Sequence, residues 1–294
     1  MPNPFHSRRD PRQGATVDTT LLKGRTVLMS GGSRGIGLAI LVAAARAGAN
    51  VVFLAKTDVP DPRLPGTVHT AVAAIREAGG SAVSVVGDVR DSADVTRAVD
   101  TALDHFGSID ICVNNASAID LRPTEELPVK RFALMQEVNV RGTYQLTRAA
   151  LPHLRRSTHA HILTLSPPLN LSPRWLGAHP AYTLAKYGMT LLTLGWAAEY
   201  AERGIAANCL WPQTTVATAA VANVLGGQSL TDRSRSPDIM ADAAVAVLSR
   251  PPRERTGATL IDAPVLTGAG LTDLSGYGGG EHPELDLFLD SFEP

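Results

Sequence analysis

The strongest constraint on the fold is a regular alternation of short apolar runs with longer helical patterns, which begins at about Lys23. Most of the short runs are apolar throughout, as in strands that are buried on both faces of a parallel sheet. They predict strands at Thr26–Met29, Val51–Leu54, Ala82–Val86, Ile109–Val113, His161–Leu165, Ile205–Leu210 and Thr259–Ile261. The longer patterns predict helices at Ile36–Ala47, Val68–Ala78, Ala93–His105, Leu134–Leu154, Tyr182–Ala201 and Pro237–Ser249. This alternation, with right-handed crossovers, predicts an α/β fold: a Rossmann-type doubly wound, mainly seven-stranded parallel sheet with helices on both faces.

No repeat and no change of composition marks a second domain, so residues 23–266 are predicted to form a single domain. Residues 1–22 are polar and rich in proline, which indicates a flexible N-terminal tail. Residues 267–294 are predicted to form an extended C-terminal arm. Two irregular stretches, Lys56–Gly66 and Gln213–Ser234, are expected to be functional loops.

The composition disfavours several kinds of protein. A net charge of −1 gives no general attraction to nucleic acid or to acidic membranes, and no apolar run reaches the ~18 residues of a membrane span. The N-terminus lacks the apolar segment of a secretory signal. Its arginines would allow a mitochondrial transit peptide, but its prolines disfavour the helix that such a signal needs. Cys112 and Cys209 each lie in an apolar run, which indicates packing in a reducing compartment. We therefore expect a cytoplasmic protein with no nucleic-acid partner and no metal site.

A glycine-rich segment follows the first predicted strand and opens the first predicted helix. It reads Ser30-Gly31-Gly32-Ser33-Arg34-Gly35-Ile36-Gly37. A tight turn without Cβ atoms, placed at a helix N-terminus, lets backbone N–H groups approach a pyrophosphate. The spacing alone is a weak signal and also fits a plain glycine-rich turn. Its place on the first βα junction favours a dinucleotide site made by Gly31, Ser33, Arg34, Gly35, Ile36 and Gly37.

The end of the second predicted strand bears on which dinucleotide would bind. Sites for NAD place a carboxylate there to hold the ribose 2′-hydroxyl, but this strand ends in Leu54-Ala55-Lys56-Thr57, and the first acid is Asp58. Lys56 and Arg34 could together hold a 2′-phosphate, which only NADP carries. The alternative is that Lys56 is a solvated lysine at a strand end. The pattern favours NADP(H) over NAD(H).

Tyr182 and Lys186 stand four residues apart on a predicted helix and therefore share a face. Lysine is scarce here, with only four lysines among the 27 basic residues, so its use at this position suggests that arginine would not serve. A free tyrosine has a pKa near 10, and a neighbouring ammonium favours the phenolate. The pair therefore predicts an acid–base site, although an aromatic residue packed beside a lysine stem would give the same spacing.

Further motifs occur in a fixed order along the chain. Asp88-Val89 follows the third predicted strand, Asn114-Asn115-Ala116 follows the fourth, and Asn139 lies in the next helix. With the glycine-rich segment and Tyr182-xxx-Lys186, they resemble the short-chain dehydrogenase/reductase family over about residues 24–262. The strings AKTDVPDPRLPGT, VNVRGTYQLT, ILTLSPPLNL, AYTLAKYGM and LWPQT are similar to those of its hydroxysteroid dehydrogenase-like members. Animal members continue into a sterol-carrier-like domain, which this chain is expected to lack.

The resemblance implies a role for each matching residue. Asp88 would bond the adenine amine, with Val89 beside the ring, and Asn115 and Ala116 would line the ribose and nicotinamide side. Lys186 would bind the nicotinamide ribose and lower the pKa of Tyr182, which would exchange a proton with the substrate oxygen. Asn139 would hold a water molecule that links Lys186 to solvent.

The chain departs from the family pattern at three places. Pro167 stands where the family has its catalytic serine; Ser166 is the preferred substitute and Ser172 a poorer one. The usual Pro-Gly after the sixth strand is Pro212-Gln213, followed by Thr214, which is expected to contact the carboxamide of the cofactor together with Pro212. Ser117 replaces a glycine after Ala116.

These residues predict an NADP(H)-dependent oxidoreductase that interconverts an alcohol and a carbonyl on a largely apolar small molecule, such as a steroid or fatty-acyl derivative. Its pocket is expected between Ser166–Trp175 and Gln213–Ser234. Two alternatives remain: a cofactor-binding protein with little turnover, and a reductase of activated C=C bonds. The family resemblance also implies a homodimer or homotetramer paired through Leu134–Leu154 and Tyr182–Ala201.

Overall fold

The seven predicted strands form one sheet in the computed structural model, which describes residues 21–61, 65–219, 221–222 and 227–292. The strands are β1 (Thr26–Ser30), β2 (Asn50–Ala55), β3 (Ser81–Val86), β4 (Ile111–Asn114), β5 (His161–Thr164), β6 (Ala206–Trp211) and β7 (Thr259–Ile261). Their order is β3-β2-β1-β4-β5-β6-β7, and every neighbouring pair is parallel. The predicted doubly wound parallel sheet is confirmed.

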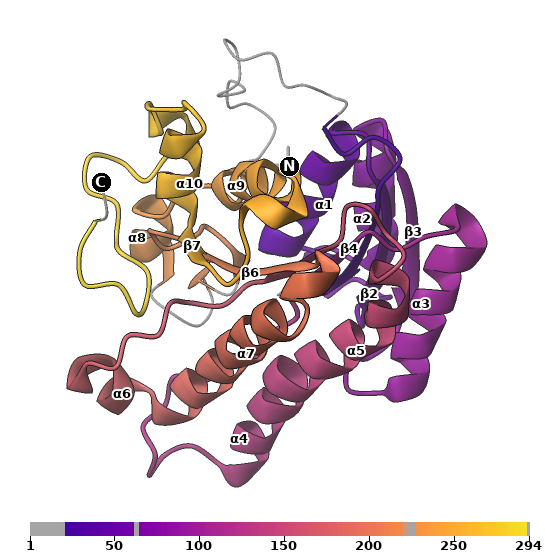
Figure 1. Ribbon diagram of the computed structural model, residues 1–294. Helices are drawn as coiled ribbons and strands as arrows, with labels where there is room; N and C mark the ends of the chain where they lie inside the picture. The colour runs from indigo at the N-terminus through magenta and orange to yellow at the C-terminus, as the bar shows by residue number, and fades with distance from the viewer. Residues whose placement is uncertain (1–20, 62–64, 220, 223–226, 293–294) are drawn as a thin grey trace.

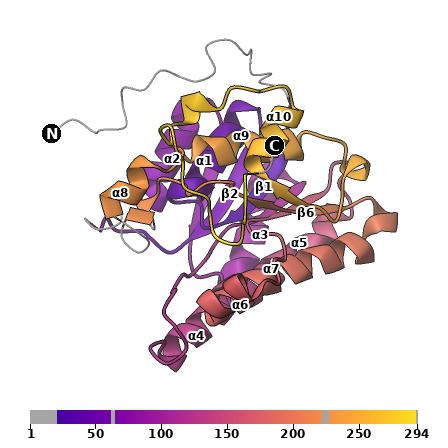
Figure 2. The same cartoon turned by 90° about the vertical axis from the view of Figure 1, so that its left-hand side faces the viewer.

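Helices cover both faces of this sheet (Figures 1 and 2). One face carries α1 (Gly35–Arg46), α2 (Val68–Glu77), α9 (Asp238–Leu248) and α10 (Asp262–Gly268), and the other carries α3 (Ser92–Phe106), α5 (Gly142–Leu154) and α7 (Pro180–Glu199). Each face has its own apolar core, because the strands are apolar on both sides. From the centre of the sheet, β1 to β3 are added toward one edge and β4 to β7 toward the other. A crevice therefore lies between β1 and β4, at the carboxyl ends of these two strands.

The helix predicted at Leu134–Leu154 begins earlier and is not uniform. It consists of α4 (Val129–Met135), a π-helical turn η1 (Gln136–Arg141) and α5, joined without a break. The predicted loop Gln213–Ser234 contains the short helix α8 (Gly227–Asp232), and another short helix, α6 (Pro173–Ala178), lies between β5 and α7. Single 3-10 turns lie at η2 (Ala201–Arg203), η4 (Pro252–Glu254) and η5 (Ser275–Tyr277).

The C-terminal residues return to the carboxyl edge of the sheet. The limit predicted at residue 267 lies inside α10, and the chain beyond it folds back so that Thr214 and Leu285 form an antiparallel bridge. Phe288 and Leu289 are buried, because they pack on a cluster of aromatic side chains that includes Tyr182 and Trp211. Of the predicted N-terminal tail, residues 1–20 lie outside the described residues, and Leu22 is buried against the main core.

Neither of two structural signatures occurs within the described ranges. No helix there combines the length and the apolar character needed to cross a bilayer. No group of three or more His, Cys, Asp or Glu side chains gathers there in a way that could hold a metal ion.

Candidate active site

The glycine-rich turn after β1 is locked by Asn115. The Asn115 Nδ2 atom donates to the carbonyl oxygens of Gly31 at 2.6 Å and of Ser30 at 3.2 Å. Gly31 has a φ of +79°, and a Cβ there would lie 2.8 Å from Asn115 Nδ2. A Cβ on Gly37 would collide with the Gly31 carbonyl oxygen. The turn therefore requires glycine at both positions, and Asn115 shapes the cradle rather than facing outward from it.

Helix α1 starts directly after this turn with its first N–H groups uncapped. Arg34, its N-cap residue, makes no side-chain hydrogen bond to them, and the first turn contains no acid. Gly35, at a φ of +55°, lets the backbone turn into the helix. Uncapped N–H groups and the positive end of the helix dipole suit a pyrophosphate.

The adenosine end of the site holds the charged residues at the ends of β2 and β3. Lys56 Nζ lies 3.1 Å from the Asp88 carboxylate, which Arg90 also bonds through its Nε and Nη2 atoms. The hydrogen bonds from Arg90 hold the pKa of Asp88 well below its usual range, with Lys56 contributing. Arg34 Nη2 donates to Thr57 Oγ1 at 2.6 Å. Arg34 thus reaches the residue next to Lys56, and Lys56 itself is paired with Asp88.

Val89 and Ala116 are positioned by contacts with their neighbours in the sheet and helices. Val89 is buried, its carbonyl oxygen accepts from Gln145 Nε2 at 3.1 Å, and a Cβ on Gly142 would lie 2.7 Å from it. The Ala116 backbone N–H donates to Ser30 Oγ at 3.2 Å. Val89 is therefore held against α5, and Ala116 is held against the start of the glycine-rich turn.

The predicted acid–base pair is buried on α7. Tyr182 and Lys186 are each 4 % exposed, and Lys186 Nζ donates to the Leu165 carbonyl oxygen at 2.9 Å. The same ammonium lies 5.2 Å from the centre of the Trp211 ring. Burial lowers the pKa of Lys186 to about 8. Burial also raises the pKa of Tyr182, with the charge of Asp286 adding to the rise, so the free protein holds the phenol protonated.

Asn139 occupies the π-helical turn η1 and is fully buried. Its Oδ1 atom accepts from the Ala118 N–H at 2.7 Å, and its Nδ2 atom donates to the Ala118 carbonyl at 3.1 Å. The side chain is therefore committed to the loop after β4. A water molecule of the relay would therefore have to bind the main chain of this turn. The change from α- to π-helical hydrogen bonding alters which backbone carbonyls of the turn are free to accept from water.

Ser166 lies two residues after β5 with no exposed surface, and its hydroxyl, beside the Cys209 thiol, has no nitrogen or oxygen partner among the described residues. The carbonyl of the adjacent Pro167 accepts from Thr190 Oγ1 at 2.7 Å, which ties this loop to α7. The structure thus ties Pro167 to α7 through its carbonyl and places the buried hydroxyl of Ser166 directly before it. The Ser172 hydroxyl is also buried and unpartnered within the described part of the chain.

The turn after β6 is held by Asp262, which sequence reasoning missed. The Gln213 N–H donates to Asp262 Oδ1 at 2.8 Å, and burial raises the pKa of this carboxyl to about 6. Thr214, next along the chain, is fully buried with an unpartnered hydroxyl among the described residues. An acid directly after a predicted strand is a signal that could have singled out Asp262, since ligands bind at the carboxyl ends of such strands.

An aromatic cluster surrounds the Tyr182 ring. Phe288 lies with its ring centre 6.2 Å from that of Tyr182 at an interplanar angle of 24°. Trp175, Tyr187 and Trp211 contact Phe288 with ring centres 5.7, 5.2 and 6.1 Å away. The structure therefore brings Trp175 of the predicted pocket and Tyr182 to the same ring, that of Phe288, whereas Leu171, also expected to line the pocket, is 68 % exposed. Phe288 comes from the C-terminal arm and was not predicted.

The residues present fit a bound nicotinamide dinucleotide. The glycine cradle and the uncapped α1 suit the pyrophosphate, and the buried Thr214 hydroxyl lacks a protein partner within the described residues.

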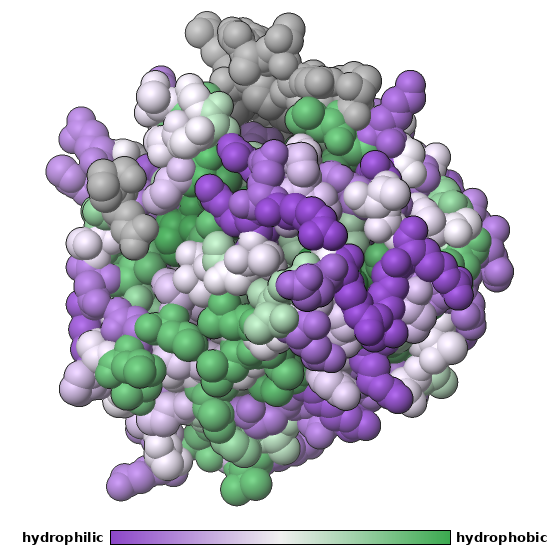
Figure 3. Space-filling view, viewed as in Figure 1, coloured by the Kyte–Doolittle hydropathy of each residue, from purple (hydrophilic) through white to green (hydrophobic). Residues whose placement is uncertain are grey.

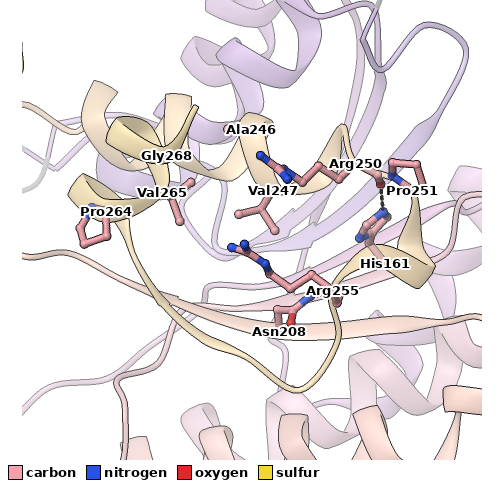
Figure 4. Close-up of a pocket in the computed structure, with 10 residues that line it drawn as sticks. All are labelled: His161, Asn208, Ala246, Val247, Arg250, Pro251, Arg255, Pro264, Val265 and Gly268. Carbon is pink, nitrogen blue, oxygen red and sulfur yellow. Dashed lines mark hydrogen bonds between the residues drawn. The ribbon is translucent and has the colours of Figure 1, made fainter. Parts of the chain in front are cut away.

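A separate cavity lies on the α9 and α10 side of the sheet, lined by residues that include His161, Asn208 and Arg250 (Figure 4). His161 Nε2 bonds the Arg250 carbonyl at 3.0 Å, and Asn208 bonds the backbone of Arg255 and Ala258. Its central polar groups are satisfied, and neither Tyr182 nor Lys186 lines it.

Comparison with known proteins identifies the family. The short chain dehydrogenase family model matches residues 25–227. The chain belongs to this family. Members of this family are oxidoreductases that work with a nicotinamide cofactor.

Individual relatives agree with the motif analysis. The chain is 50 % identical over 275 residues to hydroxysteroid dehydrogenase-like protein 2 of Xenopus tropicalis, covering 93 % of this chain and 65 % of the relative. It is 46 % identical to the human protein of the same name, covering 94 % of this chain and 66 % of that relative. A short chain dehydrogenase structure from Mycobacterium thermoresistibile is 52 % identical with a TM-score of 0.87, covering 93 % of this chain and 98 % of that one. The predicted resemblance to hydroxysteroid dehydrogenase-like proteins is confirmed.

Proposed function

We propose that this short-chain dehydrogenase is an NADP(H)-dependent enzyme that interconverts an alcohol and a carbonyl on a largely apolar small molecule. One observation carries the proposal: Tyr182 and Lys186 are buried one helical turn apart, with Tyr182 in an aromatic cluster and Lys186 over the ring of Trp211 at the end of β6. A protonated phenol in a dry pocket is suited to donate a proton to a carbonyl oxygen as that oxygen gains charge.

The residues divide the chemistry among them. The bound cofactor supplies or accepts the hydride. In reduction Tyr182 donates its phenolic proton to the carbonyl oxygen. In oxidation the phenol would first pass its proton toward solvent through Lys186 and the Asn139 turn, and the phenolate would then take the proton of the alcohol. Lys186 holds its ammonium close to the phenol and to the cofactor ribose, and the Asn139 turn leads its proton toward solvent. Ser166, the buried unpartnered hydroxyl, is the proposed second donor to the substrate oxygen.

The cofactor site is proposed to follow the motifs. Gly31, Ser33, Arg34, Gly35, Ile36 and Gly37 hold the pyrophosphate side; Asp88, Val89, Asn115 and Ala116 hold the adenosine and ribose side; Pro212 and Thr214 hold the carboxamide. Arg34 and Lys56 favour NADP(H), because two cations close to the end of β2 suit a 2′-phosphate. When NADP binds, Lys56 shares its charge between that phosphate and Asp88.

The substrate is proposed to be flat and apolar in the part that contacts the pocket. Trp175, Trp211 and Phe288 present aromatic surface next to Tyr182, and aromatic walls with few polar groups suit steroid or fatty-acyl derivatives. The relatives' name points to the same class of compound.

Matched tyrosine variants test the proposal. We expect wild type to reduce at least one of a panel of apolar ketones with NADPH, and Tyr182→Phe to lose about 10²–10⁴-fold in turnover while it still binds NADPH. Tyr187→Phe is the control, because Tyr187 lies on the same helix but its hydroxyl is engaged with the Asn170 backbone. Equal inactivity of all three proteins, with NADPH bound, would contradict the proposal.

Pro167 favours one competing function, a cofactor-binding protein with little turnover. Loss of one oxyanion donor typically lowers catalysis 10²–10³-fold, so a chain without a substitute for the family's serine would be slow. The ketone panel separates the two functions, and enoyl substrates in the same panel test a reductase of C=C bonds.

We also propose that copies of this chain pair through the outer faces of α5 and α7. Leu184 and Leu191 are 55 % and 58 % exposed on α7, seven residues apart and hence on one face, and Tyr144 is 47 % exposed on α5. Figure 3 shows apolar side chains gathered over the lower part of one face, where α6 and α7 run in Figure 1. Light scattering is expected to give the mass of a dimer or tetramer, and the mass of a single chain would contradict this.

A further inference from the structure

The C-terminal arm joins the two stretches that were expected to bound the substrate pocket. Directly after β6, the Gln213 carbonyl accepts from the Asp286 N–H at 3.1 Å. In the stretch after β5, Asn170 Nδ2 donates to the Phe288 carbonyl at 3.1 Å. The arm therefore crosses the carboxyl edge of the sheet between β5 and β6, at the edge where ligands of such folds bind.

The backbone of the arm is strained at Phe288. This residue has a φ of +73°, the only positive φ outside glycine among the described residues. A bulky residue adopts this left-handed conformation only where its surroundings fix it, and such residues concentrate at active sites. Two bonds fix it here, because Trp211 Nε1 donates to the preceding Leu287 carbonyl at 3.0 Å and Asn170 holds the Phe288 carbonyl. Asn170 is anchored in turn by the Tyr187 hydroxyl, which donates to its carbonyl at 2.6 Å.

The ring carried by this strained backbone lies against Tyr182. It is 1 % exposed, and its centre lies 6.2 Å from that of the Tyr182 ring. Trp175 and Trp211 contact the same ring from the two sides of the expected pocket. A ketone bonded to the Tyr182 hydroxyl has its oxygen about 3 Å from the phenol oxygen. Its carbon substituents must therefore lie beside the rings that surround Tyr182.

We propose that Phe288 is a specificity-determining residue, whose ring forms one wall of the substrate pocket and limits the bulk of the ketone that reaches Tyr182. This role rests on the proposed alcohol–carbonyl interconversion and adds the residue that selects its substrate. Filling of the core alone does not account for the strain, because Leu289 is buried in the same cluster without a positive φ.

Truncation of the Phe288 ring should change the pocket without touching the acid–base pair. Removal of a large buried side chain leaves a cavity when its neighbours relax only in part, and an apolar cavity of this kind accepts apolar ligands. A bulky ketone could then extend into the space beside Tyr182. A small ketone should gain nothing, because its substituents do not reach that space.

The first experiment measures ketone binding without turnover. Cyclohexanone and 2-decalone, a small and a large apolar ketone, are titrated into protein loaded with NADP⁺, which has no hydride to transfer. Tryptophan fluorescence reports binding beside Trp175 and Trp211. We expect Phe288→Leu to lower the Kd of 2-decalone relative to that of cyclohexanone by about 10-fold, and Phe288→Ala to lower it further.

Leu289→Ala is the matched control. Leu289 is 6 % exposed and lies in the same arm and the same apolar cluster. Its truncation should weaken the packing of the arm and leave the ratio of the two Kd values unchanged. NADPH binding at wild-type affinity identifies the folded variants. Phe288→Leu keeps most of the apolar volume, so it decides the matter even where Phe288→Ala does not fold.

Reduction of the same two ketones with NADPH gives the second readout. The kcat/KM for 2-decalone relative to that for cyclohexanone should rise in Phe288→Leu by the same factor as the binding ratio. An unchanged Kd ratio in folded Phe288→Leu protein, or an equal shift in Leu289→Ala, would overturn the role of Phe288. Ketones that bind but are never reduced would instead contradict the proposed function, and the Kd ratio would still decide the role of Phe288. Absence of ketone binding by wild type and by both Phe288 variants would contradict both.

Discussion

At the adenosine end of the site, charged groups pair directly and remain partly in solvent. Lys56 and Arg90 both contact the Asp88 carboxylate, and the Lys56 side chain is 62 % exposed. At the reaction end, Lys186 is 4 % exposed, and its ammonium contacts a backbone carbonyl and the Trp211 ring. The adenosine end therefore holds its charges as solvent-exposed ion pairs, whereas the reaction end holds a charged group that is buried against an aromatic ring.

The difference shows how one fold serves two tasks. Exposed, paired charges can exchange partners at little cost, which suits recognition of a phosphate that arrives from solvent. Shielded charges interact over longer distances and shift the pKa values of their neighbours, which suits proton transfer. Substitutions at the adenosine end should therefore change affinity, and substitutions at the reaction end should change stability and proton chemistry.

The largest expected effect is a loss of stability at the reaction end. Phe288→Ala removes a ring that is buried among Trp175, Tyr182, Tyr187 and Trp211, and such truncations cost about 3–5 kcal/mol of unfolding free energy. Urea unfolding measures the change. Phe292→Ala, in the same arm but 50 % exposed, is the control and should cost under ~0.5 kcal/mol. Similar values for both variants would mean that the arm is not part of the packed site.

A smaller effect is expected at the adenosine end, and only in cofactor affinity. Lys56→Ala removes one charge-assisted contact to the 2′-phosphate, so the Kd for NADPH should rise about 10- to 100-fold while that for NADH changes little. Calorimetric titration with each cofactor measures this. The exposed Lys130→Ala serves as control. Equal losses for NADPH and NADH would remove the basis for the NADP(H) preference.

The strands and the place of the main motifs could be predicted because each depends on a local pattern. Continuous apolar runs identified the buried strands, and the glycine-rich turn, Asn115 and the Tyr182–Lys186 spacing lie within single elements. The start of α4 and the π-helical turn at Asn139 escaped prediction, because apolar periodicity does not distinguish α- from π-helical bonding.

The rest of the site depends on contacts between residues far apart in the chain. Phe288 lies more than a hundred residues from Tyr182, and Asp286 meets Gln213 through backbone bonds that no side-chain pattern encodes. Residues 267–294 were therefore predicted only as an extended arm, with no contacts to the site. Its apolar residues near Phe288 were visible, but their partners were not.

The central claim is that the bound cofactor and Tyr182 act together on a carbonyl, and isotope transfer tests it most directly. Wild-type protein is incubated with an apolar ketone and with NADPH that carries deuterium in its transferable position, and the product is examined by mass spectrometry. We expect deuterium on the former carbonyl carbon, with Tyr187→Phe forming the same product and Tyr182→Phe forming at least 10²-fold less. Bound NADPH with no deuterium transferred to any ketone of the panel would contradict the account, as would transfer only to the C=C carbons of enoyl substrates.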